Sequence, residues 1–328
     1  MNSKCREYPL LVYLDQNKWI DLAKIEYGSV KTDEGNRLLE NICGAVRDNK
    51  VLFPLSIVHL DEINKISSEI HRQQLAALMV KLSKGYSLSP YVENHIAIEV
   101  DQIITSKLGY PHIDLRQVFL KQGIHHLIGA KVNIVSRNGD KNKKPPRNVK
   151  EKMLCLLFDP WAFELSLTKR VSNPSLRQYQ KEAATKMDET RKRLLKIKDN
   201  DLRKRIYLVQ NVLSIIVPHI IELLTDRGLS KDFFKIDEWN REDVDRFLTN
   251  VPTGLTFITL SMYMDLQFQK AIKVNDIADI WGLTLAIPYC DIIVTEKRWV
   301  SIAKQAKLDR VCNTIMLSSI NDLKEYLR

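Results

Sequence analysis

The fold class is decided by residues 9–25, PLLVYLDQNKWIDLAKI, in which a short apolar run passes directly into a segment with helical spacing. The run Pro9–Asp15 is rich in β-forming residues and ends at an acid. After it, apolar residues recur with helical spacing at Trp19, Leu22 and Ala23. This combination is typical of a buried parallel strand that leads into a helix on the face of a sheet.

The same alternation continues to residue 65 and returns at the other end of the chain. Near the N-terminus we expect a helix over Gly35–Asp48, a strand over Val51–Leu55 and a helix that Ser56 caps. The later elements are predicted as helix, strand, helix, strand and helix, over Val274–Ile287, Asp291–Thr295, Lys297–Leu308, Val311–Leu317 and Ser318–Leu327. Because such alternation forms parallel sheets, we predict an α/β fold: a Rossmann-like parallel sheet sandwiched by helices and formed from both chain ends.

The long segment between these ends has helical spacing. Its apolar residues recur every three or four positions without a convincing series of strands, so we predict a large all-α insertion. The stretch SRNGDKNKKPPRNVKEK, residues 136–152, is polar, basic and contains two adjacent prolines, which indicates a loop. The predicted organisation is residues 1–65 as the first half of the core, 66–272 as the insertion and 273–328 as the second half.

Composition argues against several classes of protein. The 328 residues are 45% hydrophobic and 27% charged, as in folded soluble proteins. The five cysteines form no CxxC pair, which argues against a zinc knuckle or a disulfide framework, and the sequence lacks the phosphate-binding motif GxGxxG. The most apolar stretch, Val209–Leu224, is interrupted by polar residues, and no secretory signal is recognisable. We therefore expect a cytoplasmic protein without a membrane segment.

The charge distribution points to a polyanion as partner. The chain carries a net charge of +10, and the segment Leu176–Tyr207 holds eleven lysines and arginines against five acids. One interpretation is an arm that contacts nucleic-acid phosphates. The alternative, a solvated helix face with many salt bridges, stays open at this point.

Acidic residues follow the predicted strands at the edge of the sheet where open parallel sheets bind ligands. Asp15 ends the first strand, Glu62 lies in the helix after the second, and Glu296 follows the third. Asp276 and Asp279 lie three residues apart on the helix before that strand, so either can be the third acid. Clustered carboxylates repel one another unless cations neutralise them, and Mg²⁺ or Mn²⁺ takes oxygen ligands of this kind.

Three segments of the chain resemble the motifs of the PIN-domain nuclease family. Their residues are Asp15 and Asn17 in LVYLDQN, Ser56 and Glu62 in SIVHLDE, and Asp279, Ala286 and Thr295 in DIWGLTLAIPYCDIIVT. As in the family, Glu62 comes six residues after Ser56, and the third acid precedes a small residue by seven positions and a strand-ending threonine by sixteen. The chain departs from the family at Lys297, where an acid is common, and Glu296 is the candidate substitute.

The resemblance implies a nuclease that depends on Mg²⁺ or Mn²⁺ and cleaves RNA more often than DNA. The implied catalytic residues are Asp15, Glu62, Asp279 and Glu296, with Asp276 as a further metal ligand, and the implied substrate-positioning residues are Asn17, Thr295, Lys18, Lys297 and Arg298. With its large insertion, the chain looks more like the larger PIN-like nucleases of bacterial toxin–antitoxin and phage-defence systems. The resemblance therefore implies an antitoxin or a defence-system protein as a possible partner. It also implies that the protein can form a homodimer. The alternative function is a catalytically inactive PIN-like module that binds nucleic acid or protein.

Overall fold

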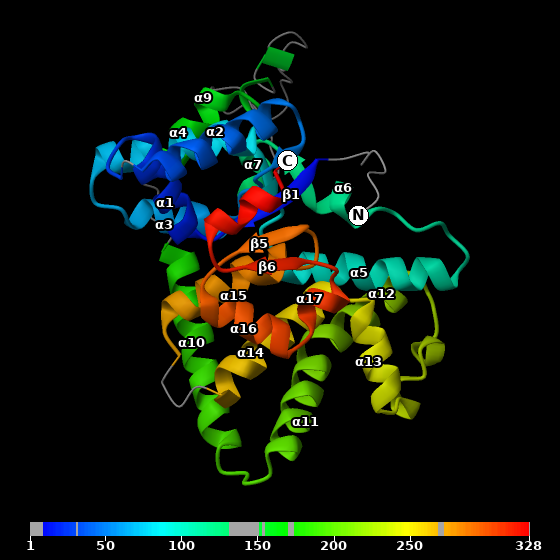
Figure 1. Ribbon diagram of the computed structural model, residues 1–328. Helices are drawn as coiled ribbons and strands as arrows, with labels where there is room; N and C mark the ends of the chain where they lie inside the picture. Colours follow the sequence, from blue (N-terminus) through cyan, green and yellow to red (C-terminus); the bar gives the residue numbers. More distant parts are fainter. Residues whose placement is uncertain are drawn as a thin grey trace.

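A four-stranded parallel sheet forms the centre of the computed structural model, with the strand order β2-β1-β5-β6 (Figure 1). Two strands come from each end of the chain: β1 (Leu10–Leu14), β2 (Val51–Leu52), β5 (Ile292–Val294) and β6 (Ile315–Leu317). The α/β class and the parallel sheet built from both ends are therefore confirmed. The structure describes residues 9–30, 32–130, 151–152, 155–169, 174–267 and 272–327.

The sheet is apolar on both faces because helices cover both. In β1, Val12 and Leu14 point into one buried cluster, whereas Leu11 and Tyr13 point into another. The first cluster lies under α1 (Gln16–Glu26), α2 (Asp33–Arg47), α3 (Ile57–Lys65), α4 (Glu69–Ser83) and η4 (Ile320–Glu325). The second lies under α14 (Pro252–Gln267), α15 (Val274–Ala286), α16 (Lys297–Gln305) and α17 (Leu308–Val311). The pair β1 and β5 therefore lies at the centre of two helical layers.

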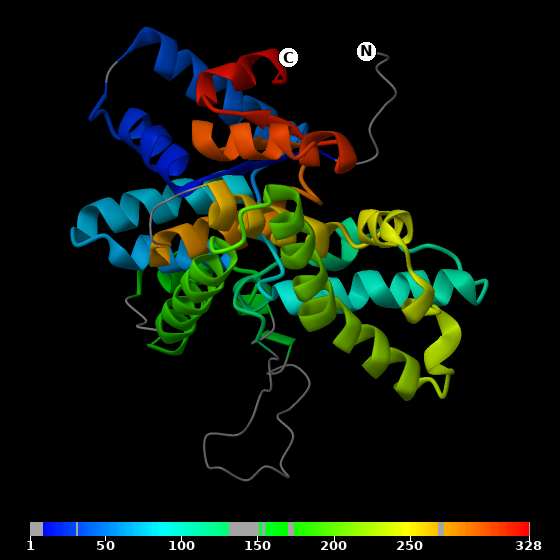
Figure 2. The same cartoon turned by 90° about the horizontal axis from the view of Figure 1, so that it is seen from below.

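The middle of the chain is mostly helical and has a third buried cluster. Its main helices are α5 (Val92–Lys107), α9 (Pro160–Thr168), α10 (Pro174–Leu194), α11 (Asn200–Asn211), the π-helical turn η1 (Val212–Ile216), α12 (Val217–Asp226) and α13 (Arg241–Thr249). The shorter ones are α6 (Leu115–Phe119), α7 (Ile124–Leu127), η2 (Lys231–Phe233) and η3 (Ile236–Glu238). In Figure 2 the blue and red ends of the chain lie together, and most of the green and yellow middle segments extend away from them.

The prediction of an all-helical insertion is wrong in one respect. Strands β3 (Tyr86–Leu88) and β4 (Leu120–Gln122) form a small antiparallel sheet, and Leu88 donates its backbone N–H to Leu55 at 2.7 Å. The two short strands, YSL and LKQ, contain polar residues, so the sequence shows no apolar run there that would indicate a buried strand. This region is also packed onto the core, because Phe163 of α9 joins the first cluster and Leu88 joins the second.

Several boundaries near the C-terminus also differ from the predicted ones. The segment predicted as the strand Val311–Leu317 forms a strand only from Ile315, since α17 occupies its first residue. The closing helix is the 3-10 helix η4, which Ser319 caps. The predicted basic loop at residues 136–152 lies outside the described residues, apart from its last two, which are helical.

One helix among the described residues has the length and composition of a membrane span, which by itself does not test the expectation of a protein without a membrane segment. The continuous helix Asn200–Asp226, made of α11, η1 and α12, has a mean hydropathy of 1.6 over its most apolar window. Its residues Val212, Ile216, Ile220 and Leu224 pack into the third cluster, and 22% of that window is buried. Core helices of soluble proteins meet the same criterion, so the cytoplasmic location stays a prediction.

Candidate acidic site

The carboxyl ends of β1 and β5 place Asp15 beside Thr295. The two strands are adjacent and parallel, and Asp15 donates its backbone N–H to Val294 at 2.9 Å. The Thr295 hydroxyl donates to Asp15 Oδ2 at 2.9 Å, and the backbone N–H of Gln16 donates to Oδ1 at 2.7 Å. Asp15 is therefore the N-cap of α1, and both of its carboxylate oxygens are held in place.

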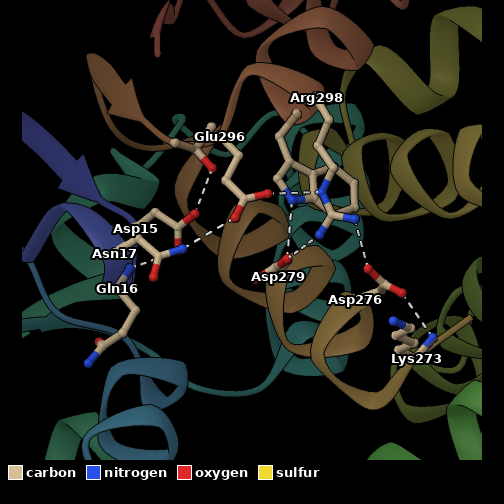
Figure 3. A network of polar contacts seen from close by, with 10 residues as sticks. Asp15, Gln16, Asn17, Lys273, Asp276, Asp279, Glu296 and Arg298 are labelled. Carbon is tan, nitrogen blue, oxygen red and sulfur yellow. Dashed lines mark hydrogen bonds and ion pairs between the residues drawn. The ribbon is translucent and has the colours of Figure 1, made fainter. Parts of the chain in front are cut away.

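A second group of acids surrounds Arg298 at the start of α16 (Figure 3). Its guanidinium group contacts Asp276 at 2.9 Å and Asp279 at 2.7 Å, both on α15, and Glu296 at 3.2 Å. The indole N–H of Trp299 donates to Asp279 Oδ2 at 3.3 Å. One arginine thus neutralises part of the charge of three carboxylates from two elements.

Asn17, which lies two residues after Asp15 at the start of α1, contacts the second group through Glu296 (Figure 3). Its side-chain amide donates to Glu296 Oε1 at 3.2 Å, while Glu296 also contacts Arg298. The site therefore combines the end of β1 and the start of α1 with α15, the end of β5 and the start of α16.

Negative charge exceeds positive charge within this network, and the pKa values reflect it. Burial and the charge of Asp15 together raise the pKa of Asp279 to about 7, against the opposing effect of Arg298. Burial also raises the pKa of Asp15, with an addition from Glu296, while hydrogen bonds from Thr295 and Gln16 lower it. Ionising all the acids together is therefore costly.

The donor chemistry fits a hard divalent cation, although Arg298 lies among the donors. Asp15, Asp279 and Glu296 act on one another electrostatically and offer only oxygen ligands, which Mg²⁺ prefers. Within the described ranges, no three histidine, cysteine or acidic side chains lie close enough together, as arranged here, to hold a metal ion. The Arg298 side chain, which is 35% exposed, occupies the space between these carboxylates.

The structure brings most of the predicted site residues together but separates Glu62 from them. Hydrogen bonds join Asp15 to Thr295 and Asn17 to Glu296, and ion pairs join Arg298 to Asp276, Asp279 and Glu296. Glu62 lies on α3 and forms an ion pair with Lys65 at 2.6 Å. None of the interactions between described residues links Glu62 to the other acids, although α3 packs against α15.

The remaining predicted residues, Lys18, Lys297 and the two candidates for the third acid, differ in how they interact with the acids of the site. Lys18 lies close enough for its charge to lower the pKa of Asp15. Lys297 is exposed and has no ion pair with the acids in the described part of the chain. Both candidates for the third acid contact Arg298, but the charge of Asp15 acts on the pKa of Asp279, which favours Asp279.

Trp299 is a site residue that the sequence pattern did not reveal. Its apolar position in a helix predicts only core packing, and the ring is indeed fully buried. A buried indole N–H needs an acceptor, and here the acceptor is the Asp279 carboxylate. In the sequence, only its position directly after the candidate site residue Arg298 indicated that Trp299 could lie at the site.

Most of the eleven lysines and arginines of α10, α11 and the segment between them have no carboxylate partner among the described residues. Among the eleven between Arg177 and Arg205, the described ion pairs involve Arg191 and Lys192 with Asp188, and Lys204 with Asp201. A solvated helix face stabilised by many salt bridges would show more ion pairs between these basic residues and neighbouring acids. The exposed cationic surface is therefore available to an anionic partner.

No protein-family model matches this chain, and neither the curated proteins nor the solved structures yield a match. The likeness to the PIN-domain family therefore rests on the three motif spacings. Because one fold serves many functions, the function has to be argued from the site itself.

Proposed function

We propose that the protein is a metal-dependent endoribonuclease of the PIN-like kind. The observation that carries this proposal is the set of Asp15, Asp279 and Glu296, which three separate elements place at the carboxyl edge of β1 and β5 with an excess of negative charge. Such a set is costly for folding and is typical of sites that bind a cation for catalysis.

In this proposal Asp15, Asp279 and Glu296 hold Mg²⁺ or Mn²⁺, with Asp276 as an auxiliary acid. When bound, the cation supplies positive charge that activates water and stabilises the leaving oxygen of a phosphodiester. The Thr295 hydroxyl keeps the Asp15 carboxylate in its orientation, and the Asn17 amide does the same for Glu296. Arg298 balances the acids before the metal binds, and its guanidinium group can then pair with a substrate phosphate.

The exposed lysines and arginines of α10 and α11 are proposed to bind the RNA backbone. Each neutralised phosphate releases counterions, so RNA binding should weaken steeply as salt increases. The resemblance to larger bacterial PIN-like nucleases suggests a toxin or phage-defence effector as the setting, with an antitoxin or defence partner and a homodimer as further proposals.

Two observations favour an inactive PIN-like binding module as the second candidate. Glu62 is paired with Lys65 instead of joining the acids, and Lys297 stands where an acid is common in the family. In that case the basic helices would bind RNA while the acidic network only stabilises the fold.

The test is cleavage of a mixture of structured and single-stranded RNA by the purified protein, with Mg²⁺, Mn²⁺ or EDTA. We expect cleavage that requires metal and falls at least about 100-fold in Asp15→Asn. The matched control is Asp21→Asn, an exposed acid on the same helix that pairs only with Lys24 among the described residues. Cleavage that survives in Asp15→Asn would contradict the assignment of the site. No cleavage together with salt-sensitive RNA binding would support the binding module.

A further inference from the structure

A cavity of about 1000 Å³ lies between α5, α10, the helix formed by α11 and η1, α14 and α15. Its size is at the upper end of the range for small-molecule sites. Helix α15 contributes Ile277, Ile280 and Trp281 to its wall, while Asp276 and Asp279 of the same helix belong to the acidic site. The cavity is therefore distinct from the acidic site but shares one helix with it.

The lining of this cavity includes a buried carboxylate, Asp265, whose oxygens can accept further hydrogen bonds. Asp265 and Ser261 are each 1% exposed, and neither Asp265 oxygen has a hydrogen bond of normal geometry to the described residues. The Tyr207 hydroxyl acts on Asp265 but can donate only one proton, and the nearby Arg191 is paired with Asp188 at 2.7 Å. Burial raises the pKa of Asp265 to about 7. A ligand that donates two hydrogen bonds would satisfy this carboxylate and stabilise its ionised form.

Other residues that line the cavity add two further properties. Phe257, Ile277 and Ile280 give the cavity an apolar lining, and Tyr179 and Trp281, which also line it, have ring centroids 5.3 Å apart. Lys186 and Arg193 also line the cavity; both are exposed, and neither has a carboxylate partner among the described residues. A flat ring fits the apolar lining, and an anionic group fits the two basic side chains.

We propose that this cavity binds a guanine nucleotide, with the base against Asp265 and the phosphate at Lys186 and Arg193. The edge of guanine carries two adjacent N–H donors, which match the two oxygens of one carboxylate. Adenine and cytosine present one amino group beside an acceptor, and uracil presents one N–H between acceptors. These bases would leave part of the carboxylate unsatisfied or face it with an oxygen or nitrogen lone pair.

Calorimetric titration with GMP, AMP, CMP and UMP, in EDTA and without RNA, tests this proposal independently of any nuclease activity. We expect GMP to bind at least about tenfold more tightly than the other three and Asp265→Asn to remove this preference. The double variant Lys186→Ala with Arg193→Ala should weaken GMP binding but leave guanosine binding unchanged. Lys181→Ala, at an exposed lysine of α10 that does not line this cavity, is the matched control and should bind GMP normally.

Thermal melting followed by circular dichroism checks the fold of each variant. If Asp265→Asn does not fold, the surface double variant still tests the phosphate site, and the four nucleotides still test the choice of base. Absence of GMP binding at millimolar concentration, equal binding of all four nucleotides, or unchanged GMP binding in the double variant would each overturn the proposal.

Discussion

Arg298 decides the electrostatic balance of the acidic site at the scale of single residues. It contacts three carboxylates at distances of 2.7 to 3.2 Å and lies over the ring of Trp299 at 4.8 Å. Removing it would leave these acids without a direct cationic partner. The same carboxylates would then be fully available to a divalent metal ion.

We expect Arg298→Ala to lower the free energy of unfolding at pH 8 by about 2 kcal/mol. This cost is smaller than that of breaking a fully buried ion pair, because the Arg298 side chain is partly exposed. The loss should be smaller at pH 5, where Asp279 is protonated, and Mg²⁺ should restore part of it at pH 8. Urea unfolding with and without Mg²⁺ measures both effects. Lys297→Ala, at the exposed neighbour, should change neither quantity.

The raised pKa of Asp279 predicts how the proposed cleavage depends on pH. The acid must lose its proton to bind a metal ion, and burial holds its pKa at about 7. At fixed, subsaturating Mg²⁺, the single-turnover rate should therefore rise by up to about tenfold per pH unit below 7 and level off above it. A rate that stays flat from pH 5.5 to pH 8.5 would show that Asp279 does not bind the metal in the rate-limiting step.

At the scale of elements, α15 can position Asp279 only because it packs closely on β1. The contact occurs at Gly282, where an added Cβ atom would lie 2.7 Å from the hydroxyl oxygen of Tyr13. That hydroxyl is fixed by Ser56 at 3.0 Å, so it has little freedom to move away. The distance between helix and sheet, and with it the place of Asp279, depends on this glycine.

Gly282→Ala should therefore lower the free energy of unfolding by about 1 to 3 kcal/mol and reduce cleavage beyond what the loss of folded protein explains. Chemical denaturation and the rate per folded molecule separate the two effects. Gly44→Ala is the matched control, because Gly44 also lies in a helix and an added Cβ meets nothing within 4 Å. It should leave cleavage unchanged and stabilise the fold by up to about 1 kcal/mol.

The sequence predicts those elements whose periodicity is long enough to be recognised. Strand β1 and its helix α1, and the later pair α15 and β5, appear because apolar runs and helical spacing alternate over many residues. The strands β3 and β4 were missed because their sequences, YSL and LKQ, contain polar residues and form no apolar run like those of β5 and β6. Strand ends also predicted the neighbourhood of Asp15 and Thr295, since parallel strands deliver their carboxyl ends to one edge.

Side-chain partners were less predictable than positions along the chain. Glu62 lies at the expected spacing after Ser56, yet its carboxylate forms an ion pair with Lys65, which lies one helical turn away. The cavity at Asp265 could not be predicted, because its lining comes from five separate segments. The sequence pattern within one segment does not indicate which distant segments line the same cavity.

At the scale of the whole molecule, Glu99 connects the middle of the chain with the core. It lies on α5, is 1% exposed, and accepts hydrogen bonds from the backbone N–H of Thr253 on α14 at 3.0 Å and from the Tyr289 hydroxyl. Burial raises its pKa from the ordinary value of 4.5 to about 7, while these hydrogen bonds oppose the shift. The folded protein therefore holds this proton more tightly than the unfolded chain.

A raised pKa stabilises the fold fully below pH 4.5, and that contribution is lost as pH rises through 7. Between pH 5 and pH 8, wild-type protein should therefore lose up to about 3 kcal/mol more stability than Glu99→Gln, which cannot titrate. Urea unfolding across this range measures the difference. Asp265 and Asp279 titrate in both proteins and cancel in the comparison, so equal pH dependence would contradict the buried position of Glu99.

The most direct test of the central claim is the single-turnover rate of RNA cleavage as Mn²⁺ is titrated, in wild-type protein and in Asp279→Asn. The acidic site predicts a rate that saturates with Mn²⁺ in the wild type and is at least about 100-fold lower at every Mn²⁺ concentration in the variant. A wild-type rate that does not depend on the metal, or a variant that cleaves as fast as the wild type, would contradict a metal-dependent nuclease built on these acids.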